Sequence, residues 1–169
     1  MFISISLVLF SCVEIEPVSP IPEITFKSLT QGIDTSMNQV VGILKFDFID
    51  GDADIGIYPG ELVTDSPGWD KRYYNVFLVP YRKSDTIYYP IEIDSTRMPP
   101  PYYTIMYNEK LDRVGQNKTI KGTINILIVD LPLYDTIKYD FYIRDRAGNY
   151  SNTETTTDMG TRIPENVTF

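Results

Sequence analysis

The sequence contains no histidine, and this absence removes the side chain that most often serves as a general base near neutral pH. Serine–histidine and cysteine–histidine nucleophile pairs are therefore excluded, and so are zinc sites that depend on imidazole. The single cysteine, Cys12, can form neither an intrachain disulfide nor a cysteine-based metal site by itself. Glycine-rich phosphate-binding loops are also missing. These absences exclude most of the common catalytic classes.

Positive charge is scarce as well. The 169 residues include 15 Lys and Arg against 23 Asp and Glu, which gives a net charge of -8. This balance argues against binding to nucleic acid and against electrostatic docking on an anionic membrane. Metal cations and neutral ligands fit it better. A hydrophobic content of 43% is enough to bury one core, so we expect one globular domain.

The first residues, "MFISISLVLFSC", form an apolar run that is too short to span a bilayer and suits an export signal. Leu9 stands three residues before Cys12, and Ser11 stands directly before it. The stretch resembles the lipobox of bacterial lipoproteins. The resemblance implies that residues 1–11 are a signal peptide and that Cys12 becomes the lipidated N-terminus, which anchors the chain to a membrane. The alternative is a buried N-terminal strand with an apolar cysteine.

Residues 12–22 contain three prolines and no core periodicity, which predicts an extended tether after the lipidated cysteine. Glu14 and Glu16 resemble the acidic stretch that directs lipoproteins of the Bacteroidetes to the outer face of the outer membrane. We therefore expect a lipid-anchored protein of the outer membrane, at the cell surface or on the periplasmic face.

Apolar and polar residues alternate along much of the remaining chain, a pattern typical of half-buried antiparallel strands. Leu44, Phe46 and Phe48 share one face of "ILKFDFID", for example. The same alternation predicts strands within residues 23–29, 43–50, 73–81, 86–93, 123–130, 136–145 and 150–157. About seven strands without an amphipathic helix predict an all-β fold, a single immunoglobulin-like or fibronectin-type-III-like antiparallel β-sandwich.

We assign this sandwich to residues 23–160, followed by a C-terminal tail at residues 161–169. Two prolines fall within predicted strands, Pro80 and Pro90. Because proline has no N–H to donate to a ladder, both are expected at strand ends or sheet edges.

Two motifs stand near the two ends of the predicted sandwich, "FDFIDGDADIG" at residues 46–56 and "YDFYIRDRAGNYSNTETT" at residues 139–156. Together they resemble a group of uncharacterised Bacteroidetes lipoproteins. The resemblance implies an immunoglobulin-like sandwich with a membrane anchor, and it implies no chemistry, because a fold does not fix a function.

The first motif predicts a cation site. Asp50, Asp52 and Asp54 alternate along the chain, so their carboxylates point to one side and repel one another. With Asp50 as the first position of a calcium loop, the Gly56 carbonyl is the seventh ligand position and Glu61 the twelfth. The alternative is a solvated acidic hairpin turn. Ile55 occupies the position where such a loop usually has glycine, and neither flank reads as a helix.

The second motif reads first as a turn at Gly148 and Asn149, in which Asp145 and Asn152 hydrogen-bond the neighbouring backbone. Arg146, with Arg144, would pair with carboxylates of the first motif if the two turns met in space.

Aromatic residues predict a second type of site, because exposed Tyr and Trp rings bind sugars and proteins. The residues are Trp69, Tyr102, Tyr103 and Tyr107. The alternative is that they pack over the open ends of the sandwich. A carboxylate-dependent glycan hydrolase that uses Glu92, Asp94 or Glu109 is also open, although none of the three belongs to a recognisable signature.

The sequence thus favours a non-catalytic binding or structural module that is anchored in the cell envelope and stabilised by calcium. The expected partners are the membrane, through the lipid anchor, and an unidentified protein or glycan, with no nucleic acid. An accessory subunit of a larger envelope assembly is a further alternative.

Overall fold

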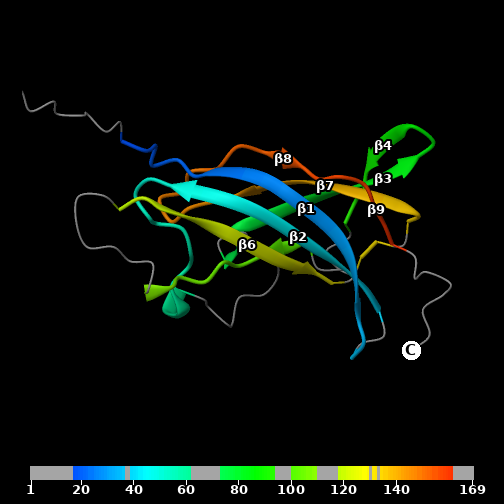
Figure 1. Cartoon of the computed structure of the whole chain (residues 1–169), viewed down its shortest axis with the longest axis horizontal. Helices are drawn as coiled ribbons and strands as arrows, with labels where there is room; N and C mark the ends of the chain where they lie inside the picture. The colour runs from blue at the N-terminus through cyan, green and yellow to red at the C-terminus, as the bar shows by residue number, and fades with distance from the viewer. Residues whose placement is uncertain are drawn as a thin grey trace, which may run out of the picture.

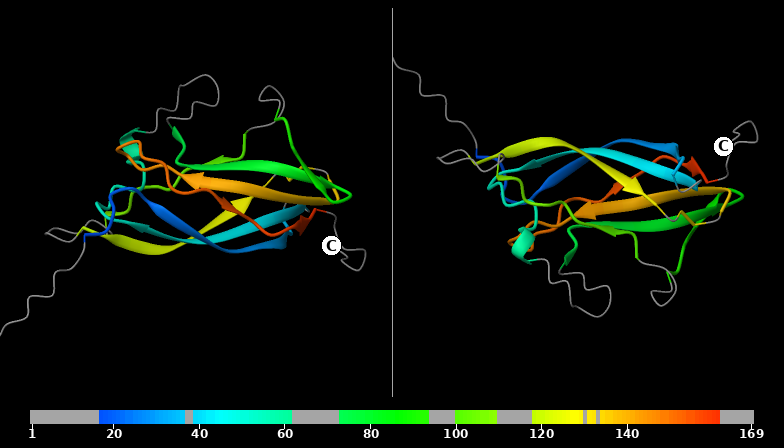
Figure 2. Two further views of the ribbon diagram at one scale, coloured as in Figure 1. Left: turned by 90° about the horizontal axis from the view of Figure 1, so that it is seen from above. Right: turned by 90° about the horizontal axis from the view of Figure 1, so that it is seen from below.

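The computed structural model describes residues 17–36, 39–61, 73–93, 100–109, 118–129, 131–132 and 134–161. These residues form two antiparallel sheets that pack face to face, and the edge-on views show the two layers clearly (Figure 2). The described residues contain no α-helix; a short 3-10 helix, η1, covers Pro59–Glu61. No helix in this part of the chain has the length and apolar character needed to cross a bilayer.

The first sheet has three strands in the order β1-β2-β6, and it is the front layer in Figure 1. Its strands are β1 (Glu23–Asp34), β2 (Gln39–Asp50) and β6 (Ile120–Ile128). The register between β1 and β2 shifts between Phe26 and Ser28, whereas β2 and β6 pair without a shift.

The second sheet has the main order β4-β3-β7-β8, with β5 paired to β3 and β9 paired to β7. Its strands are β3 (Val76–Ser84), β4 (Ile87–Pro90), β5 (Tyr102–Tyr103), β7 (Thr136–Ile143), β8 (Glu154–Thr155) and β9 (Met159–Gly160). Because the chain crosses between the sheets after β2, β5 and β6, the fold is the predicted immunoglobulin-like β-sandwich. The strand predicted at residues 150–157 is shorter than expected, since β8 has two residues.

The core lies between the sheets and follows the period-two pattern. Residues 44, 46 and 48 of β2 point inward as predicted, and every second residue of β7 from Ile137 to Ile143 is at most 1% exposed. The rings of Phe46 and Phe141 join the layers, with centroids 5.2 Å apart. Each large apolar side chain buried in this way stabilises the fold by about 1.5–3 kcal/mol.

One strand prediction was wrong. Pro90 does end β4, but Pro80 lies inside β3, where it is buried and faces Tyr139 of β7 in the ladder. The Pro80 carbonyl accepts a hydrogen bond from the Ile91 N–H at 2.9 Å, so its backbone polar groups point to the β4 and β5 side of β3. On that side, Pro80 lies between the residues that pair with β5 and those that pair with β4. A missing N–H costs no ladder bond at that gap.

The described chain begins beside the end of β2. The Gly51 N–H donates to the Ser19 carbonyl at 3.0 Å, and a Cβ at Gly51 would overlap the carbonyls of Val18 and Ser19. The segment before β1 therefore lies directly against the acidic turn. The other end of the described chain lies at the far end of the sandwich (Figure 1).

Candidate metal centre

The acidic turn is built around the carboxylate of Asp50, the last residue of β2. Asp50 is 0% exposed, and its Oδ2 accepts hydrogen bonds from the N–H groups of Asp54 at 2.9 Å and Ile55 at 3.1 Å. These bonds fold the chain back on itself, so that Ile55 enters the core. Ala53, with φ of 61°, and Gly56, with φ of 100°, supply the left-handed backbone that the turn requires.

The turn gathers the three aspartates that the sequence singled out. One carboxylate oxygen from each of Asp50, Asp52 and Asp54 lies within 4.8 Å of the others. Asp50 Oδ1 and Asp54 Oδ1 are both buried, and neither has a hydrogen-bond partner among the described residues. Buried carboxylate oxygens without a donor are rare in folded proteins, because burial removes the water that would solvate them.

The electrostatics of the cluster are unfavourable for three negative charges. Burial, reinforced by the neighbouring Asp52 and Asp54, raises the pKa of Asp50 to about 7. Burial is also the largest cause of the raised pKa of Asp54. Like charges about 4 Å apart repel by ~1 kcal/mol in water and ~4 kcal/mol near a protein surface. A bound cation would offset the repulsion among the three carboxylates and would give the two buried oxygens a positively charged partner.

The second sequence motif packs against this turn. The Ala147 N–H donates to Asp54 Oδ2 at 2.8 Å, and the Arg146 N–H donates to the Asp54 carbonyl at 3.2 Å. Asp145 holds the motif in shape, because its carboxylate accepts the backbone and side-chain N–H groups of Asn149 at 2.7 and 2.8 Å. The two motifs, far apart in the sequence, therefore form one structural unit.

The guanidinium of Arg146 binds differently from the expected pairing with carboxylates. Its Nη1 donates to the Gly56 carbonyl at 3.2 Å, and its Cζ lies 4.6 Å from the ring centre of Tyr58 and 5.3 Å from that of Tyr107. Its charge still lowers the pKa of Asp54, although burial outweighs this effect. The guanidinium of Arg144 also binds a backbone carbonyl, since it donates to that of Tyr74 at 3.2 Å.

The remaining predicted site residues lie outside the cluster of three aspartates or outside the described structure. The Gly56 carbonyl, predicted at the seventh position, accepts the Arg146 bond. Glu61 is the last residue of η1, and its side chain lies outside the described part of the structure, as do Cys12 and Trp69. Asp94 is likewise outside it, and the acidic group at the turn includes neither Glu92 nor Glu109.

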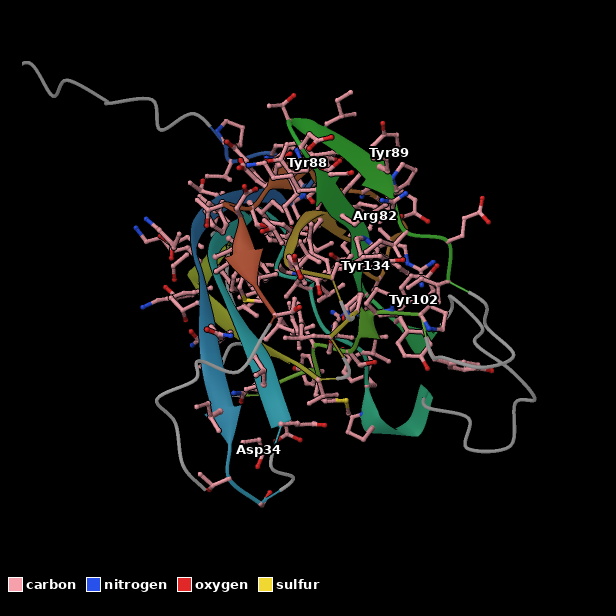
Figure 3. The ribbon with its side chains drawn as sticks, turned by 90° about the vertical axis from the view of Figure 1, so that its right-hand side faces the viewer. Asp34, Arg82, Tyr88, Tyr89, Tyr102 and Tyr134 are labelled. Carbon is pink, nitrogen blue, oxygen red and sulfur yellow. The ribbon has the colours of Figure 1, made fainter. Side chains whose placement is uncertain are left out.

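The three described tyrosines of the predicted aromatic site do not form one surface. Tyr103 packs against the core, and Tyr107 contacts the ring of Tyr58 with centroids 4.3 Å apart. Tyr102, labelled in Figure 3, packs at 5.2 Å against Phe77 on the outer face of the second sheet. These contacts agree with the packing alternative, and they leave ligand binding by these residues as a prediction.

Sequence reasoning missed two features. The Asn152 side chain accepts the Ile24 N–H at 2.8 Å and donates to the Ile24 carbonyl at 2.9 Å, whereas we expected a bond to neighbouring backbone. Arg82 lies between the rings of Tyr89 and Tyr134, at 5.0 and 5.7 Å from their centres (Figure 3). The contacts of Asn152 with Ile24 and of Arg82 with Tyr134 have no local sequence signal, because each joins residues distant along the chain.

Comparison of the chain with protein-family models, with curated proteins and with solved structures finds no match.

Proposed function

We propose that this protein is a non-catalytic module of the cell envelope, held to the outer membrane by a lipid on Cys12 and stabilised at its tethered end by a calcium ion. The observation that best supports the ion is the fully buried Asp50, whose Oδ1 has no donor within the described residues and whose carboxylate lies in a cluster with those of Asp52 and Asp54. A buried carboxylate in such surroundings needs a positive partner.

Calcium fits the donor set better than the transition metals. The cluster offers only oxygen atoms, and calcium takes six to eight oxygen ligands in flexible geometry. Asp50, Asp52 and Asp54 would supply the negative ligands, with backbone carbonyls and water completing the shell. The ion would join the end of β2 to the turn at Asp54, which already binds the second motif through Ala147.

The anchor hypothesis is supported by the lipobox-like sequence and by the position of the tether. Cys12 stands seven residues before Ser19, which accepts the Gly51 hydrogen bond. Seven residues span at most roughly 25 Å. A lipid on Cys12 would therefore hold the acidic turn close to the membrane and the opposite end of the sandwich, with its partner protein or glycan, further out.

Thermal unfolding of the full chain in calcium and in chelator tests the ion. Ligand at about a hundred times its Kd adds ~2.7 kcal/mol of stability, which corresponds to a rise in melting temperature of roughly 5–10 °C for a chain of this size. Asp52→Asn should abolish this rise, and it should itself raise the midpoint in chelator, because it removes a charge that repels Asp50. An unchanged midpoint in the parent chain would contradict the calcium proposal.

The matched control is Asp85→Asn. Asp85 is exposed, and its φ of 56° suits asparagine equally well. This variant makes the same change in net charge away from the turn, so the calcium response should persist.

The anchor is tested separately by mass spectrometry of the N-terminal peptide from native membranes. The expected product begins at Cys12 and carries acyl chains on the thiol and the amino group. A product with an unmodified thiol in a soluble fraction would refute the anchor and leave the calcium proposal intact.

A further inference from the structure

β6 is the exposed edge of the three-stranded sheet. It pairs with β2 over nine consecutive residues with no register shift, and it forms the lower border of the front layer in Figure 1. The strand "IKGTINILI" contains no proline, and Lys121 is its one charged residue. Such an edge presents a row of backbone N–H and C=O groups with which another strand can pair.

The other edges of the sandwich are short or obstructed. β1 carries a register shift, and the backbone of Ile24 already binds the Asn152 side chain. β4 has four residues and ends at Pro90, while β8 and β9 have two residues each. Shifts, prolines, short strands and charged side chains, lysine especially, are the means by which proteins prevent edge pairing. Within the described structure, β6 has only the last of these, at Lys121.

A groove of about 240 Å³ lies beside β6, between the sheets. Its walls are mainly apolar and include Phe48, Ile55, Ile105 and Ile124. Gly122 is at an inward-facing position of β6, between Ile120 and Ile124, and a Cβ added there would lie 3.2 Å from Phe48 Cε1. The ring of Phe48 therefore covers Gly122, and the groove opens beside this pair.

We propose that β6 pairs antiparallel with β6 of a second copy of this chain, in a two-fold symmetric dimer centred on Ile124. Directly opposed residues of antiparallel strands point to the same face, so this register keeps the apolar rows of both copies inward. It places Ile126 of the second copy opposite Gly122, beside the groove. The symmetry makes this contact twice.

The strand is complementary to itself in apolar pattern and brings no like charges together, which is why we assign a second copy as the occupant. In this register all nine residues of each strand overlap. Lys121 lies opposite Leu127 of the second copy, and Thr123 lies opposite Asn125. No two like charges face each other across the pair, although each copy has a net charge of -8.

Sedimentation of the full chain in density-matched detergent tests the proposal. The expected result is a dimer that dissociates on dilution, with hydrogen exchange of the β6 amides slowing as concentration rises. Leu127 is 50% exposed, and Leu127→Lys would face Lys121 at both symmetric positions. The dimer should weaken by roughly two- to thirtyfold. Leu127→Glu should retain the dimer, because the opposed charges then attract.

The double variant Lys121→Glu with Leu127→Lys should restore the dimer by exchanging the charges. Ile87→Lys is the matched control, since Ile87 is 56% exposed on the β4 edge and its substitution should leave the dimer unchanged. Thermal unfolding of each variant establishes that it is folded. A monomer at all concentrations, a dimer unaffected by Leu127→Lys, or equal weakening by Lys and Glu would each overturn the proposal.

Discussion

The two oxygens of the Asp50 carboxylate have conflicting requirements when no cation is bound. Its Oδ2 organises the turn by accepting two backbone N–H groups, and this role places the whole carboxylate in the protein interior. Its Oδ1 then has no donor in the described structure, and the carboxylates of Asp52 and Asp54 lie close by. In the cation-free chain, protonation of Asp50 is the remaining way to remove the buried charge.

The first prediction concerns pH in the presence of chelator. The raised pKa of Asp50, about 7 against an ordinary 3.8, means that the folded chain binds one more proton than the unfolded chain between about pH 4 and pH 7. The contribution of this group to stability is therefore present below this window and is lost as pH rises through it. The raised pKa of Asp54 acts in the same direction.

Urea unfolding at about pH 5 and about pH 7.5 measures this effect, and stability should be higher at the lower pH. Asp47 and Asp158, whose pKa values are lowered, act below this window and do not obscure it. Asp50→Asn keeps an acceptor for the two N–H groups and should flatten the dependence. Equal stability of the parent chain at both pH values would contradict the argument.

Tyr139 gives a second prediction at this scale. Its ring is 1% exposed in the core, and its hydroxyl has no hydrogen-bond partner among the described residues. Burial also raises the pKa of the hydroxyl, so it stays neutral. Tyr139→Phe removes an unsatisfied polar group and keeps the ring, so stability should stay the same or rise by about 1 kcal/mol. A loss of stability in urea unfolding would contradict this prediction, because it would mean that the Tyr139 hydroxyl makes a stabilising hydrogen bond.

Among the elements, β1 depends on a side chain for part of its edge. The amide of Asn152 bonds both the N–H and the carbonyl of Ile24, as a neighbouring strand would. Ser151 does the same for β7, where its Oγ accepts the Ile143 N–H at 3.0 Å and its own N–H donates to the Ile143 carbonyl. The part of the second motif at Ser151 and Asn152 therefore joins the two sheets.

Asn152→Ala should remove both bonds to Ile24 and lower the free energy of unfolding by about 1–3 kcal/mol, because the Ile24 backbone is buried and would lose its partner. Asn152→Asp keeps an acceptor for the Ile24 N–H and should give an intermediate loss. Urea unfolding of the three chains measures both effects. Equal losses from the two substitutions would show that the donor bond is the important one.

The strands and their inward faces could be predicted because alternation of apolar residues is a local signal, as in β2 and β7. The clustering of Asp50, Asp52 and Asp54 was predictable for the same reason, since it depends on spacing within one turn. The contacts of Asn152 with Ile24 and of Ala147 with Asp54 were not, because they depend on how the sheets pack. Pro80 was misplaced because the gap between β4 and β5 has no signal in the β3 sequence.

Considered as a whole, the molecule has one end where several features meet. The segment before β1, at Ser19, and the second motif both contact the acidic turn there. Gly51 has no side chain, and this lets the backbone of Val18 and Ser19 lie against the turn. A change at this residue should therefore separate the segment before β1 from the sandwich.

Gly51→Ala tests this connection. The added Cβ overlaps the carbonyls of Val18 and Ser19, so the hydrogen bond from residue 51 to Ser19 should be lost, at a cost of about 1 kcal/mol. Hydrogen exchange at the amide of residue 51 should rise, since that amide would then contact solvent. Gly60→Ala is the control, because nothing lies within 4 Å of a Cβ at Gly60. An unchanged exchange rate in the first variant would contradict this account.

If Cys12 carries a lipid, the position of the predicted tether would also determine how the molecule responds to mechanical load. In a lipid-anchored chain, drag on the outer end pulls against residue 17 and hence against the start of β1, which pairs with β2 along almost its whole length. Because the tether arrives at the end where β1 begins, the pull runs along the strand and shears all of these hydrogen bonds together. A ladder loaded in this direction resists far more force than one whose bonds open in sequence.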